Sequence, residues 1–189
     1  MDPNLPLLTL KDAAAWRDWL TTNHAVAPGA IVKIAKAGAP EPTVTQTEVI
    51  DGALCFGWID GTIRRIDDHY YCVRFTPRRA KSKWSLRNTK RVVELIESGE
   101  MTAAGQTEID NAKADGRWEA AYSMAESTMP EDFQTALSND PQALKNFNAL
   151  SAQNRFAFLF RIEDAKKPET RAKRIADYVQ MLHDGKTFH

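Results

Sequence analysis

The sequence has little of what stabilises secreted proteins and nothing that would insert into a membrane. Only two cysteines, Cys55 and Cys72, occur in 189 residues. They are too far apart for a CxxC redox motif and too few for a four-ligand zinc site. Because free cysteine buries readily, we expect two reduced core thiols and no disulfide. No apolar run approaches the ~18 residues of a membrane span, and no charged-then-apolar leader is present. The sequence therefore predicts a cytoplasmic protein without a membrane span.

Motifs for metal binding and catalysis are equally scarce. The four histidines, His24, His69, His183 and His189, lack the spacing of metal ligands. The sequence contains no GxSxG, no phosphate-loop glycine pattern and no dinucleotide fingerprint. It therefore predicts no metal and no cofactor, identifies no catalytic residue, and leaves open whether the protein is an enzyme.

Charge is balanced over the whole chain but segregated along it. Residues 62–93 contain ten basic and two acidic residues, a net charge of +8, and residues 94–140 carry −9. These adjacent blocks predict that the acidic segment packs near the basic one, with ion pairs between them. The pI of about 6.9 disfavours nucleic acid as a partner, because nucleic-acid-binding domains commonly exceed a pI of about 9.

The amino-terminal stretch shows one helix and one strand. Residues 1–8 have the composition of a loose tail, and Thr9 with Asp12 predicts the start of a helix that runs to about Asn23. Residues 30–36 alternate apolar and polar side chains, as a half-buried strand does.

The next stretch carries the best-marked helix start in the chain. Thr45 and Glu48 form a capping box, and Gly57 is placed to end the helix in a left-handed conformation. Residues 58–67 and 70–77 then alternate as two strands of a ribbon.

Beyond the ribbon the signals are helical. Helices are predicted to start at Ser85, Thr102, Thr128, Pro141 and Pro168. A strand-containing first half followed by a helical second half is α+β. We expect a small antiparallel sheet flanked by helices over residues 1–100, with a helical region, residues 101–189, packed on it.

Residues 58–88 combine arginine and tryptophan as an anion site requires. Arginine offers forked donors to phosphate or carboxylate and stacks on aromatic rings, and a helix start favours negative charge. We expect Arg64 and Arg74 to face the same side of the sheet, with Asp60 orienting one of them. The alternative is a solvated surface on which the arginines pair with acidic residues of 94–140. The candidate ligand-binding residues are Trp58, Asp60, Arg64, Arg74, Arg78, Arg79, Trp84 and Asn88.

Several short sequence blocks have a specific order and spacing along the chain. They are CFGWIDG (55–61), RFTPRR (74–79), SKWSLRN (82–88), AKADGRWEAAY (112–122) and, more weakly, RIEDAKKPETRAKRI (161–175). On these blocks the chain resembles the YdeI/OmpD-associated, or bacteriocin-protection, family over nearly its whole length. The resemblance implies an α+β amino-terminal domain, a helical carboxyl-terminal region and, by the family's name, links to antimicrobial tolerance and to a porin. It supplies no catalytic residues.

Three hypotheses for function follow. The first is a non-enzymatic stress or antimicrobial-tolerance protein that binds a small anionic ligand or a protein partner through residues 58–88. The second is an enzyme that acts on a small anionic substrate in an enclosed pocket with a group of perturbed pKa. The third is a nucleic-acid-binding protein, whose affinity would fall steeply with salt.

Overall fold

The chain forms two compact units. The computed structural model describes residues 3–123 and 127–188, and its contacts divide the chain into Met1–Ala121 and Tyr122–His189. The sequence placed this boundary near residue 100. Helix α4 (Ala103–Ala114) instead belongs to the first unit, because it packs against helix α2 (Gln46–Cys55). No helix in the described parts of the chain is long and apolar enough to cross a membrane.

A four-stranded sheet, ordered β1-β2-β4-β3, lies at the centre of the first unit. The β2–β4 and β4–β3 pairs are antiparallel, as expected, but β1 is parallel to β2, with Leu7 opposite Ile31. The α+β prediction is confirmed, although the sheet is mixed and residues 7–9 are a strand and not a loose tail. The strands are β1 (Leu7–Thr9), β2 (Ala30–Ala35), β3 (Trp58–Arg65) and β4 (Tyr70–Pro77).

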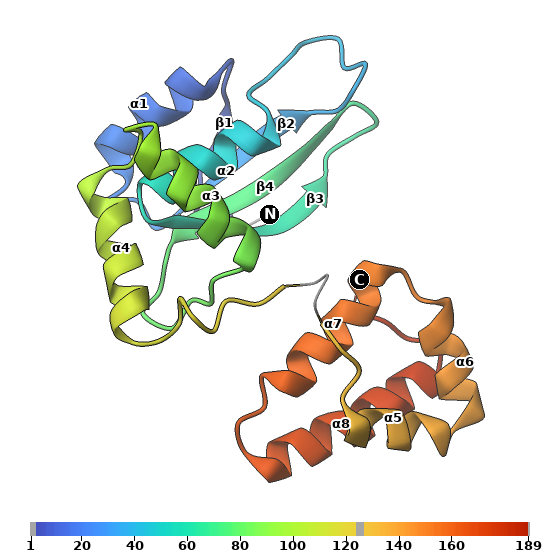
Figure 1. Ribbon diagram of the computed structural model, residues 1–189. Coiled ribbons are helices and arrows are strands. Elements are labelled where there is room, and N and C mark those ends of the chain that lie inside the picture. The colour runs from blue at the N-terminus through green and yellow to red at the C-terminus, as the bar shows by residue number, and fades with distance from the viewer. Residues whose placement is uncertain (1–2, 124–126, 189) are drawn as a thin grey trace. The chain divides into compact units, whose positions relative to one another are not determined.

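Helix α2 is the central helix of the first unit. It packs against α1 (Ala13–Asn23), α3 (Leu86–Glu97), α4 and strand β3, and Figure 1 shows it crossing the strands between α1 and α3. The predicted capping box is present at its start, where Thr45 and Glu48 bond to each other's backbone N–H groups.

Other helix starts in the first unit also follow local signals. Ser85 caps α3 by accepting a hydrogen bond from the Asn88 N–H. The prediction for α1 was wrong by three residues, because Asp12 and not Thr9 is its N-cap, accepting from the Ala15 N–H at 2.9 Å. Thr9 belongs instead to β1.

The core of the first unit lies between its helices and its sheet. Trp16, Trp58 and Phe75 are fully buried there, with the Trp16 ring edge-on to Trp58 at 6.4 Å. Cys55 and Cys72 are buried and form no disulfide, as expected. Burial also raises the pKa of the Cys55 thiol, which therefore stays protonated at neutral pH.

The regular elements of the second unit, within its described residues, are helices. Its helices are α5 (Glu131–Ser138), α6 (Pro141–Ala149), α7 (Ala152–Glu163) and α8 (Pro168–His183). Phe133, Phe147 and Phe158 form its core, with successive rings edge-on at 5.6 and 6.4 Å. The predicted capping box at Thr128 is absent, because Pro130 precedes α5 and makes no side-chain cap.

Acid is expected to destabilise the second unit through Asp132. Arg171 donates to both carboxylate oxygens of Asp132, at 2.6 and 3.0 Å, and this holds the pKa of Asp132 below its ordinary value of 3.8. A carboxylate with a lowered folded-state pKa stabilises fully above its unfolded pKa, and loses that stabilisation as pH falls through the folded pKa. The free energy of unfolding, followed by amide signals of α5 and α8, should therefore decline below about pH 5.

The matched variant for this effect is Asp132→Asn, which cannot titrate. Its free energy of unfolding should be lower than that of the wild type at neutral pH and should change less between about pH 5 and pH 1. Equal slopes for the two proteins would show that Asp132 does not contribute to the acid response.

Candidate functional site

A polar groove of about 240 Å³ lies between α2 and α3. Its residues come from one face of each helix, because side chains three or four positions apart lie on the same helix face. Three basic side chains of α3 enter it, together with two carboxylates that face each other across the helices. Its lining is Thr47, Ile50, Asp51, Arg87, Asn88, Lys90, Arg91 and Glu94.

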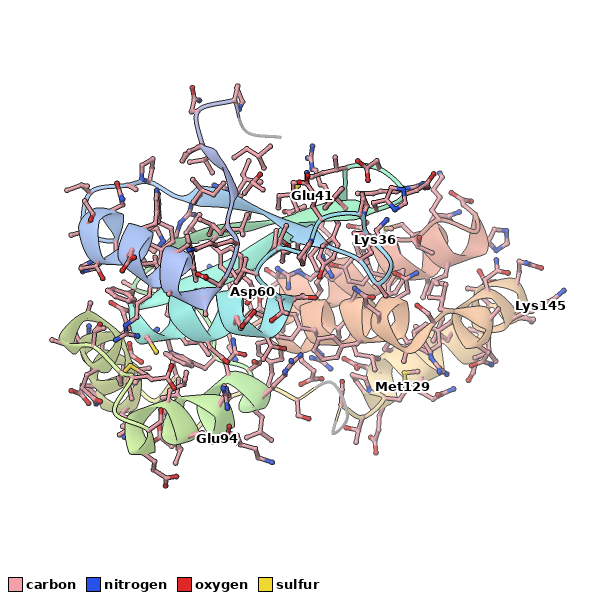
Figure 2. All side chains as sticks on the ribbon, turned by 90° about the horizontal axis from the view of Figure 1, so that it is seen from above. Lys36, Glu41, Asp60, Glu94, Met129 and Lys145 are labelled. Atoms are coloured by element: carbon pink, nitrogen blue, oxygen red, sulfur yellow. The ribbon has the colours of Figure 1, made fainter. Side chains whose placement is uncertain are left out.

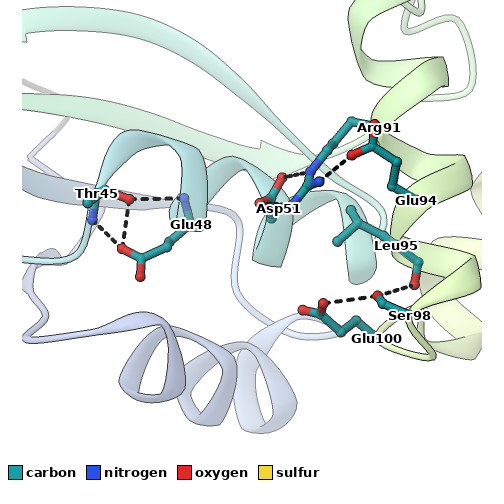
Figure 3. A network of polar contacts seen from close by, with 8 residues as sticks. All are labelled: Thr45, Glu48, Asp51, Arg91, Glu94, Leu95, Ser98 and Glu100. Carbon is teal, nitrogen blue, oxygen red and sulfur yellow. Dashed lines mark hydrogen bonds and ion pairs between the residues drawn. The ribbon is translucent and has the colours of Figure 1, made fainter.

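Arg91 joins the two walls of this groove. Its Nε and Nη2 donate to the two oxygens of Asp51, both at 2.7 Å, and its Nη1 donates to Glu94 one turn along α3 (Figure 3). These bonds raise the pKa of Arg91. The Asp51 side chain is only 14% exposed, so the pair fixes the distance between α2 and α3 as well as neutralising charge.

The remaining cations of the groove lack such partners. Arg87 and Lys90 are exposed, and within the described residues neither forms an ion pair. Asn88, a predicted site residue, lies between them in the first turn of α3. Two of the groove's three cations are therefore available to an external anion.

Arg78 and Trp84, two of the candidate ligand-binding residues, lie in contact with each other. The Arg78 guanidinium lies 3.6 Å from the centre of the Trp84 ring, and its Nη1 donates to the Lys83 carbonyl at 3.3 Å. Trp118 packs on Trp84 with ring centres 5.1 Å apart. Both members of the pair are buried, so this cation–π contact lies inside the protein.

Arg79 lies beside this pair in the loop before α3, and its side chain is exposed. The Arg79 N–H donates to the Ser82 hydroxyl at 2.9 Å, and Arg117 donates to the Ser82 carbonyl at 2.9 Å. Arg117 is a basic residue of the otherwise acidic 94–140 segment, so this contact is not the attraction between opposite charges that the sequence predicted. The described ion pair between the two segments, Arg91 with Glu94, is made within α3 itself.

Trp58 does not lie at a surface. It is 1% exposed, its indole N–H donates to the His24 carbonyl at 3.2 Å, and its ring packs edge-on against Trp19 at 5.8 Å. The stacking role predicted for Trp58 is not compatible with this position, and its contacts are those of a core residue.

Strand register separates Asp60 from the arginines that it was expected to orient. Asp60 lies opposite Phe75, whereas Arg64 lies opposite Cys72, because a bulge between Asp60 and Ile63 adds one residue to β3. Residues opposite each other share a face, and faces alternate along a strand. Arg64 and Arg74 therefore share one face of the sheet, as predicted, and Asp60 lies on the other.

Of the eight residues that line the groove, the sequence interpretation selected only Asn88. Arg87 and Lys90 were counted in the basic block but not selected, and Thr47 and Asp51 were not considered. Two signals were available: the basic residues 87, 90 and 91 fall on one helical face, and Thr47 and Asp51 are four residues apart after the capping box. Which helix α3 packs against is a tertiary property that neither signal contains.

In the described residues no group of three or more His, Cys, Asp or Glu side chains is arranged to hold a metal.

Two family descriptions match the chain. Residues 8–108 match Domain of unknown function (DUF8412), and residues 126–185 match Bacteriocin-protection, YdeI or OmpD-Associated. No curated protein and no solved structure matches it.

The resemblance found in the sequence is thus confirmed, but over one part of the chain. The weakest block, 161–175, lies within the YdeI/OmpD-associated match. The blocks 55–61, 74–79 and 82–88 lie instead in the first match, which covers more than half of the chain. The chain therefore belongs to the family described as Domain of unknown function (DUF8412), and its second unit carries a YdeI/OmpD-associated segment.

Proposed function

We propose that this chain is a non-enzymatic protein that binds an anionic ligand, or an acidic segment of a protein partner, through the α2–α3 groove. The observation that carries the proposal is the pairing of charges there. Arg91 is held by Asp51 and Glu94, while Arg87 and Lys90 extend from the same helix without a carboxylate partner in the described structure. The groove therefore carries a net positive charge that a bound anion would neutralise.

The polar groups of the groove suit a compact oxyanion. Arg87 presents forked donors, Lys90 a point charge and Asn88 an amide N–H₂, and all three come from the first turns of α3. That end of the helix also carries partial positive charge from its free N–H groups. A volume of about 240 Å³ accommodates a phosphate or carboxylate group and not a large ligand.

The name of the family that the second unit matches, which refers to bacteriocin protection, supports a role in tolerance of antimicrobial proteins. We assign the chain to that role, with anion binding as its molecular activity. The test is the survival of bacteriocin-treated cells that produce either the wild type or an Arg87→Gln/Lys90→Gln variant. Equal protection by both proteins would show that tolerance does not depend on the groove.

Anion binding itself is tested by calorimetry and thermal unfolding of the full chain with inorganic phosphate, acetate and citrate. A ligand at a hundred times its dissociation constant should stabilise the wild type by about 2.7 kcal/mol. Arg87→Gln/Lys90→Gln should weaken binding by about tenfold or more, because charge-assisted hydrogen bonds contribute ~1.5–3 kcal/mol each. The two residues are exposed, so folding should be unaffected.

The matched control removes two exposed lysines from the second unit, Lys145→Gln/Lys166→Gln. Figure 2 shows Lys145 extending outward from α6, and neither lysine forms a described ion pair. Equal losses of anion affinity in both double variants would show a general effect of net charge, and the groove would then not be the binding site. Turnover of a bound anion would favour the enzyme hypothesis, and oligonucleotide binding with a steep salt dependence would favour the nucleic-acid hypothesis.

A further inference from the structure

A second cavity, of about 300 Å³, opens into the helical unit. The apolar part of its wall comes from three places in the sequence: Met129 before α5, Phe147 on α6, and Phe156 and Leu159 on α7. Figure 2 labels Met129 in the segment leading into α5. The volume lies at the lower end of the ~300–1,000 Å³ range of small-molecule sites.

The apolar wall is held in place by the core of the unit. Phe147 and Leu159 are 3% and 8% exposed and belong to the same buried cluster as Phe133. The Phe156 ring lies nearly parallel to the ring of Tyr122, with centres 5.9 Å apart. Because these side chains pack on their own unit, the cavity does not need to form on binding.

The charged side chain that the described lining of this cavity contains is basic. Arg155 lines it, is exposed, and forms no ion pair with any residue in the described parts of the chain. Among the described residues that line it, none is acidic. The first turn of α7, whose Ala152 also lines the cavity, has no acidic side chain, so the positive end of that helix adds to the charge of Arg155. Ser127 supplies a hydroxyl.

We propose that this cavity binds a small amphipathic anion, with an apolar body against Phe147, Phe156 and Leu159 and a carboxylate on Arg155. Apolar surface buried there gains hydrophobic free energy, while a single guanidinium fixes the orientation of the acid. The α2–α3 groove is lined by a different set of residues and belongs to the first unit. The two sites are therefore separate, and this proposal does not depend on the function assigned to the groove.

The experiment titrates the full chain with hexanoate, octanoate and decanoate below their micelle concentrations, followed by NMR amide shifts. Affinity should rise about fourfold for each added methylene, the equivalent of ~0.8 kcal/mol per buried CH₂. Shifts should concentrate at residues 127–129, 147 and 152–159. Arg155→Gln should weaken octanoate binding about tenfold and leave octan-1-ol binding unchanged.

Two further variants make the test specific. Lys145→Gln removes the same charge from α6 outside the cavity lining and should change nothing. Ala152→Phe places a ring at the exposed edge of the cavity, and should weaken octanoate and octan-1-ol alike. The proposal is overturned if octanoate fails to bind, if octylamine binds as tightly, if Arg155→Gln binds as the wild type does, or if the shifts fall on the α2–α3 groove instead.

Discussion

Replacing Gly105 with alanine is expected to lower the free energy of unfolding of the first unit by about 2–3 kcal/mol. A Cβ atom at this position would lie 2.3 Å from the Cys55 carbonyl oxygen and 2.5 Å from the Met101 sulfur. The carbonyl cannot move freely, because it accepts hydrogen bonds from the Thr102 N–H and hydroxyl. The added methyl must therefore separate the end of α2 from the start of α4. The higher helix propensity of alanine offsets only about 1 kcal/mol of this loss of stability.

Urea unfolding followed by tryptophan fluorescence measures this effect, because all five tryptophans lie between residues 16 and 118 of the first unit. Ala103→Ser is the control, since it adds one heavy atom to an exposed position of α4 and should change stability by less than about 0.5 kcal/mol. An unchanged unfolding midpoint in Gly105→Ala would mean that the two helices separate at little cost.

Local chemistry explains which parts of the fold were predictable from sequence. The caps at Thr45, Ser85 and Thr102 were identified correctly, because a side chain and the backbone N–H that it accepts from lie within three residues. Proline at the start of α8 is equally local, since its fixed φ suits the first helical turn. The order of helices, and with it the α+β class, follows from such signals.

The errors concern pairings between distant segments. Leu7–Thr9 is a strand only because β2 lies beside it, about 24 residues further along the chain. The bulge in β3 places Asp60 and Arg64 on opposite faces of the sheet. It is a property of how β3 pairs with β4, which the residue types alone do not show. Trp58 was selected as a ligand-binding residue because tryptophan suits both a ligand site and a core. The α2–α3 groove needs Asp51 and Arg91, forty residues apart, to be neighbours.

Removing the Arg91 guanidinium is expected to destabilise the first unit by about 2 kcal/mol, because the partly buried Asp51 carboxylate would lose two charge-assisted hydrogen bonds. Arg91 is itself 38% exposed, so solvent screening keeps the loss near the lower end of the range for charged groups. The measurement is a double-mutant cycle of Arg91→Met and Asp51→Asn by tryptophan-monitored unfolding. We expect a coupling energy of about 1 kcal/mol between them. Additive losses would mean that the pair contributes nothing beyond its separate residues.

The same two variants decide whether the charge of the groove governs anion binding. Arg91→Met leaves Asp51 and Glu94 without their shared cation, beside Arg87 and Lys90. Phosphate affinity should then fall about tenfold, because one bound positive charge is lost and a carboxylate faces the ligand. Adding Asp51→Asn restores the original net charge and should recover most of the affinity, although the Arg91 guanidinium is still missing. If affinity stays low in the double variant, Arg91 contacts the anion directly. If neither variant changes affinity, the anion binds elsewhere and the groove is only a junction between two helices.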